Sequence, residues 1–107
     1  MTRHVRLEGV SIASTFRARL TGLMGKRDLS HIALWIPRCS SVHTFFMRSE
    51  IDLVFLDEDL TIVAIHEHAR PWRLFFGGRR TDSILELSAG RAELMLLLPG
   101  DQLEWPE

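Results

Sequence analysis

The stretch that most constrains the fold is residues 42–57, V-H-T-F-F-M-R-S-E-I-D-L-V-F-L-D, the densest apolar run in the chain. Two parts of it, residues 42–47 and 51–56, are rich in β-forming residues, which favours a hairpin or a bent, bulged strand pair. The second part is apolar on both faces except at Asp52, so we expect a central strand that is covered on both sides. Because a buried strand tolerates charged groups only when they are paired, the stretch must hold a structural polar network or a site.

Short runs of alternating or β-branched residues predict the remaining strands. These runs are residues 3–9, 31–37, 60–65, 84–87 and 101–105. Residues 69–83 are interrupted by Pro71 and by the pair Gly77-Gly78, which break regular structure. We therefore predict a long loop between the strands at 60–65 and 84–87.

Helical periodicity occurs in two places. Four apolar residues spaced at i, i+4, i+7 and i+8 form one stripe and predict the main helix at about residues 15–25. These residues are Phe16, Leu20, Leu23 and Met24. Residues 91–98 favour one or two further helical turns with Ser88 as the cap. The pair Pro99-Gly100 that follows indicates a type II turn.

The length and these elements together predict an α+β fold. A chain of 107 residues fits one domain with one core, so we expect residues 1–107 to form a single domain. The predicted architecture is a compact twisted β-sheet, or a partly closed β-barrel, of six or seven short strands. The main helix and one short helix would lie at one side or end of it.

Charge and composition argue against several classes of function. The formal net charge is -1, so no overall field attracts nucleic acid or an acidic membrane. Cys39 is the single cysteine, which rules out an intrachain disulfide. No apolar run approaches the roughly 20 residues that span a bilayer, and the first residues lack the apolar region of a secretory signal. We expect a soluble, cytoplasmic protein with no cofactor, no nucleic-acid partner and no membrane span.

Six motifs follow one another along the chain, and their order and spacing carry a family resemblance. They are R-L-T-G-L-M-G-K-R (19–27), S-V-H-T-F-F-M-R (41–48), I-D-L-V-F-L-D (51–57), R-P-W-R (70–73), L-E-L-S-A-G (85–90) and P-G-D-Q-L (99–103). From about Thr15 to Trp105 the chain resembles the small bacterial and archaeal proteins of the "domain of unknown function 192" family. The resemblance implies a compact β-rich domain with a helix and no established activity. It also implies an association of short, leaderless members with pilus or secretion genes. The family usually has a proline before the I-D pair, where this chain has Ser49-Glu50.

His43, Arg48 and Asp52 are the first candidates for a ligand-binding site. An arginine can pair bidentately with a buried carboxylate, so Arg48 and Asp52 could form a polar clamp at the turn or one wall of an anion or carboxylate pocket. His43 and Asp52 resemble a general base with its orienting acid. In a tight hairpin centred on Ser49 the register keeps them apart, however, so we expect His43 to be a hydrogen-bonded core residue.

His66 and His68 lie two residues apart on a predicted strand. Strand alternation would place both imidazoles on one face, which makes them candidates for a metal site. A third ligand would have to come from elsewhere in the chain, and His4, His43 and Asp52 are candidates. The alternative is that both histidines belong to a solvated strand end.

Arginines stand beside aromatic residues in the loop of residues 70–80. Such pairs bind phosphate, stack on bases or dock a protein partner. Arg70, Trp72 and Arg73 are therefore candidate ligand-binding residues. Exposed aromatic side chains mark a protein interface or fold back on the core more often than they bind nucleic acid.

The motifs of P-loop, dinucleotide-binding, nucleophile-elbow and zinc-binding proteins are absent from the sequence. The sequence therefore favours a non-enzymatic binding or accessory module that recognises a protein partner or a small ligand. Recognition would use the loop of residues 70–80 and the polar end of residues 42–57. The alternative is an enzyme or a metal-binding protein that uses His43, Asp52 and His66 or His68.

Overall fold

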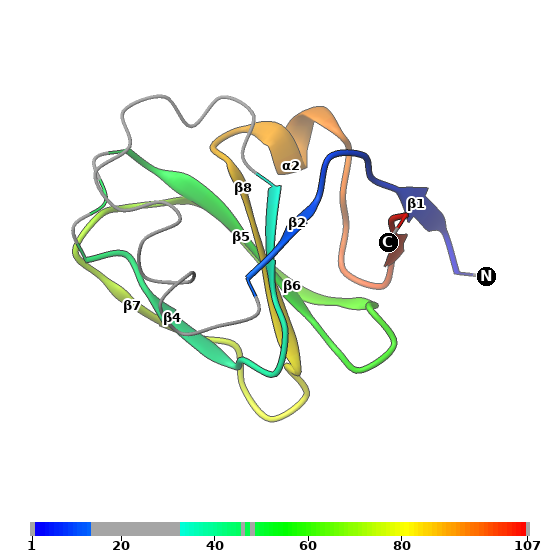
Figure 1. Cartoon of the computed structure of the whole chain (residues 1–107), viewed down its shortest axis with the longest axis horizontal. Coiled ribbons are helices and arrows are strands. Elements are labelled where there is room, and N and C mark those ends of the chain that lie inside the picture. Colours follow the sequence, from blue (N-terminus) through cyan, green and yellow to red (C-terminus); the bar gives the residue numbers. More distant parts are fainter. Residues whose placement is uncertain (1, 14–32, 46, 48, 107) are drawn as a thin grey trace.

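A computed structural model describes residues 2–13, 33–45, 47 and 49–106 (Figure 1). These residues form nine strands and one short helix, more strands than the six or seven expected. The elements are β1 (His4–Arg6), β2 (Ser11–Ile12), β3 (Ala33–Ile36), β4 (Ser41–His43), β5 (Ile51–Leu56), β6 (Ile62–Ala69), β7 (Leu74–Phe76), β8 (Ser83–Ser88), α2 (Arg91–Leu94) and β9 (Gln102–Glu104). The main helix predicted at about residues 15–25 lies outside the described residues and stays a prediction.

The strands form one larger sheet and two ribbons. The five-stranded sheet has the order β2-β3-β8-β5-β6, and only its β2–β3 pair is parallel. One ribbon pairs β4 with β7, and the other pairs β1 with β9; the two lie on opposite sides of the molecule (Figure 1). The larger sheet ends at β2 and β6. The described part of the chain is therefore β-rich, but its strands do not close into a barrel.

β5 is buried on both faces, as its sequence predicts. All six of its residues are buried, and alternate side chains enter two different apolar clusters. Leu53 and Phe55 join a cluster that contains Ile36, Cys39, Met47, Ile51 and Ile84. Val54 and Leu56 join a cluster that contains Leu7, Ile62, Leu85, Leu87, Leu97 and Leu103. Because β5 lies between β8 and β6, its backbone is paired on both edges.

The predicted pairing of residues 42–47 with 51–56 is wrong. β4 covers only Ser41–His43 and pairs with β7 in the register Ser41↔Phe76, Val42↔Phe75 and His43↔Leu74. Residues 69–83, which we expected to form a long loop, therefore contain a strand. Leu74, Phe75 and Phe76 are β-formers, and the breakers on both sides of them only limit the length of the strand.

The C-terminal part of the chain follows its turn residues. α2 starts after Gly90, whose φ of 88° is left-handed, so Gly90 and not Ser88 is its cap. Ser88 is the last residue of β8. The N–H of Asp101 donates to the carbonyl of Leu98 at 3.1 Å and Gly100 has a φ of 96°, as the predicted type II turn requires. No helix in the described part of the chain is long and apolar enough to cross a membrane.

Candidate functional site

Asp52 is a fully buried carboxylate near the start of β5 in the larger sheet. Its Oδ1 accepts a hydrogen bond from the N–H of His68 at 2.9 Å, and its Oδ2 accepts one from the N–H of Ala92 at 3.0 Å. His68 has a φ of 53° and lies in a bulge of β6, and Ala92 is in the first turn of α2. The first N–H groups of a helix have no partner within the helix. Asp52 therefore caps α2 and fixes the bulge with the same side chain.

These two bonds favour a structural role for Asp52. Both carboxylate oxygens accept backbone N–H groups, and the side chain has no exposed surface. Arg48 lies outside the described residues, so its pairing with Asp52 stays a prediction. His43 is exposed on β4, in a different sheet, and its Nδ1 accepts the N–H of Phe45 at 3.3 Å. The prediction that His43 is a core residue is wrong, and the structure does not join it to Asp52.

The two histidines of β6 contact different groups. The ring of His66 meets the edge of Phe75 with centroids 4.5 Å apart, whereas Nδ1 of His68 lies 3.2 Å from a carboxylate oxygen of Glu50. The bulge between His66 and His68 interrupts the alternation of side chains along β6. The prediction that both imidazoles share one face of the strand depended on that alternation. Among the described residues, no three His, Cys, Asp or Glu side chains are grouped as metal ligands.

Thr44 joins the end of β4 to the turn at residues 70–73. Its backbone N–H donates to the carbonyl of Arg73 at 2.9 Å, and its carbonyl accepts the N–H of Trp72 at 2.9 Å. Its buried hydroxyl donates to the carbonyl of Arg70 at 2.6 Å and accepts the N–H of Arg73 at 3.0 Å. One residue thus fixes the whole R-P-W-R turn. Thr44 was not predicted as a site residue, although it lies in the middle of the S-V-H-T-F-F-M-R motif.

The turn presents Trp72 at the surface. Trp72 has a φ of 62° and is 54% exposed. A left-handed conformation costs an ordinary residue about 1–2 kcal/mol, so the bonds to Thr44 must hold it there. The ring of Trp72 stacks on Phe45 at 5.8 Å, and Phe45 stacks on His43 at 4.9 Å. Arg70 and Arg73, both predicted as binding residues, are exposed beside this stack.

The stack continues onto one side of the β4–β7 ribbon. Leu74 lies directly opposite His43, and both are exposed together with Phe76, which is 74% exposed. The alternate residues Val42 and Phe75 point the other way and pack against the core cluster of Phe55. We call the exposed side the β4–β7 face; it consists of His43, Phe45, Trp72, Leu74 and Phe76. Phe45, Leu74 and Phe76 were not predicted as site residues, because only the strand pairing brings them together.

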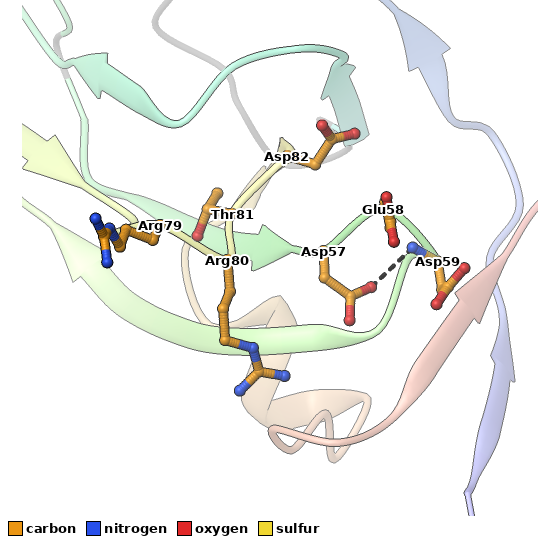
Figure 2. A pocket seen from close by; sticks show the side chains of 7 residues that line it. All are labelled: Asp57, Glu58, Asp59, Arg79, Arg80, Thr81 and Asp82. Atoms are coloured by element: carbon orange, nitrogen blue, oxygen red, sulfur yellow. Dashed lines mark hydrogen bonds between the residues drawn. The ribbon is translucent and has the colours of Figure 1, made fainter.

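A separate pocket of about 350 Å³ lies where the turn after β5 meets the segment after β7. Figure 2 shows the residues that line it: Asp57, Glu58, Asp59, Arg79, Arg80, Thr81 and Asp82. Oδ1 of Asp57 accepts the N–H groups of Asp59 at 2.8 Å and Thr61 at 3.0 Å, and the hydroxyl of Thr81 donates to the carbonyl of Gly77. These polar groups therefore stabilise the two turns.

Comparison with known proteins gives a consistent family. The model of the DUF192 family, described as "Uncharacterized ACR", matches residues 2–105. A UPF0127 protein of Thermococcus sibiricus is 32% identical over 101 residues, which cover 90% of this chain and 65% of that protein. The chain thus spans less than two thirds of that relative. A UPF0127 protein of Pyrococcus abyssi is 31% identical over 110 residues, or 97% of this chain and 92% of that protein.

A solved structure shares the fold. The crystal structure of a protein of unknown function from Novosphingobium aromaticivorans superposes with a TM-score of 0.76 at 22% sequence identity. The superposition covers 95% of this chain and 76% of that one. At this identity the similarity establishes a common fold alone.

Proposed function

The chain belongs to the DUF192 family of uncharacterised proteins, and we propose that it is a non-enzymatic binding module whose β4–β7 face recognises a protein partner. One observation carries the proposal. A buried threonine and four hydrogen bonds hold Trp72 in an unfavourable backbone conformation in which its ring stays exposed. Strain of this kind persists only where the surrounding structure enforces it, and it is concentrated at functional sites.

The composition of the β4–β7 face supports a protein partner. Trp, Phe and Arg are the residues that anchor protein interfaces, and large apolar side chains seldom cluster at the surface without a partner. Trp72, Leu74 and Phe76 are each more than half exposed, and Arg70 and Arg73 border them. The rigid turn limits the conformational entropy that these side chains lose on binding.

The geometry of the polar residues supports a non-enzymatic role. His43 is exposed and stacked, whereas Asp52 is buried and has both oxygens bonded to backbone N–H groups. A general base that is oriented by a carboxylate lies within hydrogen-bond distance of that carboxylate. Asp52 is not placed to serve His43 in this way.

The proposal is tested by affinity capture from the cell that produces the protein. Wild-type protein is compared with the double variant Trp72→Ala/Phe76→Ala and with Leu94→Ala, which removes an 83% exposed leucine of α2. We expect the wild type and Leu94→Ala to retain the same partner and the double variant to lose it. Retention of the partner by all three would refute the proposal. Mass spectrometry of the captured protein also tests the association with pilus or secretion machinery.

A further inference from the structure

β7 is an edge strand of the β4–β7 ribbon, and within the described residues its outward backbone groups have no strand partner. The N–H of Gly77 bonds to the carbonyl of Ser40 at 2.7 Å, and the N–H of Thr44 bonds to the carbonyl of Arg73 at 2.9 Å. In an antiparallel pair, bonded and non-bonded positions alternate, so Val42 and Phe75 are the bonded pair between these two. The N–H and C=O groups of Leu74 and Phe76 therefore point away from β4. Within the described structure no backbone hydrogen bond takes them to a third strand.

β7 is only three residues long, which itself limits pairing, but the strand carries no lysine, proline or inward charge that would prevent it. Edge strands are usually protected by lysine, proline, bulges or inward charges, because exposed N–H and C=O groups recruit another strand. β7 has Leu74 and Phe76 exposed instead, at 59% and 74%. Addition of an extended peptide to such an edge is a recurrent mode of protein recognition.

The two segments that form this edge carry charges of one sign, although Arg79 and Arg80 also line the pocket with Asp57, Glu58, Asp59 and Asp82. Residues 38–48 and 70–80, which contain the β4–β7 ribbon, hold six of the 13 basic residues of the chain and none of its 14 acidic residues. The rest of the chain is correspondingly acidic, and the net charge of -1 conceals the separation. Arg70 and Arg73 precede β7, Arg79 and Arg80 follow it, and all four are exposed.

We propose that β7 takes up an extended segment of the partner protein as a third strand of the β4–β7 ribbon, and that this segment carries acidic residues on both sides of a short apolar centre. The inference rests on the proposed function and specifies the partner. Two N–H and two C=O groups of Leu74 and Phe76 hydrogen-bond to the incoming strand. Its apolar side chains pack on Leu74 and Phe76, and its carboxylates pair with the arginines at both ends of β7.

The same charges argue against a second copy of this chain as the occupant. Pairing of β7 with β7 would bring the arginines at 70, 73, 79 and 80 of two copies together, and such like-charge contacts are unfavourable. Nucleic acid could bind the arginines and aromatic rings but would leave the backbone edge of β7 unpaired.

The test uses a synthetic peptide, Asp-Glu-Val-Thr-Val-Glu-Asp, blocked at both ends, and the full-length chain labelled for NMR. A lysine peptide, Lys-Lys-Val-Thr-Val-Lys-Lys, controls for charge. The acidic peptide N-methylated at both valines controls for backbone bonding, because it keeps every side chain. We expect both controls to bind about tenfold more weakly than the acidic peptide. We also expect amide exchange at Leu74 and Phe76 to slow about tenfold in the complex, while Phe75 keeps its existing protection.

Two protein variants sharpen the test. Leu74→Pro removes an outward N–H without removing a bond of the ribbon, and it should weaken peptide binding about tenfold. If this variant does not fold, the N-methylated peptide decides the same point with wild-type protein. Arg70→Glu/Arg73→Glu should lose the preference for the acidic peptide, whereas Arg6→Glu on β1 should keep it.

Three results would overturn the inference. They are equal binding of the N-methylated peptide, absence of binding at peptide concentrations of about 1 mM, and binding of a single-stranded oligothymidine in place of the peptide. Failure here is distinguishable from failure of the proposed function. If the partner captured from cells depends on Trp72 and Phe76 but leaves the amides of Leu74 and Phe76 unprotected, the β4–β7 face binds through side chains alone.

Discussion

Asp52 shows how a single charged residue can be retained inside an apolar strand. Transfer of an isolated carboxylate into the protein interior is strongly unfavourable, but hydrogen bonds from two backbone N–H groups offset much of that penalty. The donors come from β6 and α2, which are far apart in the sequence. The sequence alone showed that Asp52 is an unusual charged residue in an apolar strand. Its hydrogen-bond donors could not be predicted, because only the tertiary structure brings them to Asp52.

Replacement of Asp52 tests this role. Asp52→Ala leaves the N–H groups of His68 and Ala92 without acceptors, and we expect a loss of about 2–5 kcal/mol in the free energy of unfolding, measured with urea. Asp59→Ala, at an exposed position of the next turn, is the matched control and should change stability little. Equal stability of the two variants would show that Asp52 is not needed by the fold.

A second carboxylate, Asp101, connects the two ends of the chain. The guanidinium of Arg3 donates to Asp101 and to the carbonyl of Leu96, and Asp101 also accepts the N–H of Leu98 at 2.9 Å. The hydrogen bond from Arg3, followed by that from Leu98, lowers the pKa of Asp101 below its usual 3.8, against the opposing effect of burial. The ionised form is therefore stabilised in the folded state.

This shift predicts a specific pH dependence. A carboxyl group whose pKa is lowered by folding contributes stability above its unfolded pKa and loses it as the pH falls through its folded pKa. We expect wild type to be more stable than Asp101→Asn at neutral pH, and the difference to shrink as the pH falls through and below 3.8. Urea denaturation at several pH values measures it. A difference that is independent of pH would contradict the assigned role of the charge.

At the scale of elements, strands with strong local patterns could be predicted, and those that depend on distant contacts could not. The pattern of β5 is self-contained, so its burial on both faces followed from the sequence. The partner of β4 is determined by Thr44, which bonds to residues 26 and 29 positions away. No local pattern encodes such a contact, and the hairpin with residues 51–56 was the simplest local alternative.

In the candidate site, too, some residues could be predicted from local sequence and others depend on distant contacts. Arg70, Trp72 and Arg73 were predicted from the composition of arginine beside aromatic residues, and His43 was predicted as a polar residue in an apolar run. Phe45, Leu74 and Phe76 were missed, since in sequence they look like ordinary strand residues. The exposure of Leu74 and Phe76 becomes apparent only once Val42 and Phe75 are seen to occupy the buried side of the ribbon.

Thr44 provides the prediction at this scale. Thr44→Val preserves shape but removes the hydroxyl that bonds to Arg70 and Arg73, and should lower the free energy of unfolding by about 1–3 kcal/mol. Thr44→Ser keeps the hydroxyl and is the matched control. Amide exchange at Arg73 should accelerate in the valine variant and stay closer to wild type in the serine variant. Unchanged exchange at Arg73 in Thr44→Val would show that other contacts hold the turn.

At the scale of the whole molecule, β5 and β8 unite the two apolar clusters. Each strand sends alternate side chains to both, so neither cluster can lose its packing while the other stays intact. Trp35 and Trp105 meet edge to face at 5.4 Å beside one cluster, while Trp72 lies on the β4–β7 face. The tryptophans therefore report on different parts of the molecule.

We accordingly predict a single cooperative unfolding transition for the described core. Fluorescence of Trp72→Phe reports on Trp35 and Trp105, and fluorescence of Trp35→Phe/Trp105→Phe reports on Trp72. In each variant the urea transition should coincide with that followed by far-ultraviolet circular dichroism. An earlier fluorescence transition in the second variant would show that the β4–β7 ribbon unfolds separately.

The left-handed residues have a consequence for protein engineering. Leu96 has a φ of 57° and a side chain that is largely exposed, so glycine or asparagine there should raise the melting temperature without loss of core packing. Glycine or asparagine in place of Trp72 would relieve the same kind of backbone strain, but it would remove the exposed ring of Trp72. A directed-evolution experiment that rewards thermostability alone would therefore tolerate loss of Trp72, whereas one that rewards binding would retain it.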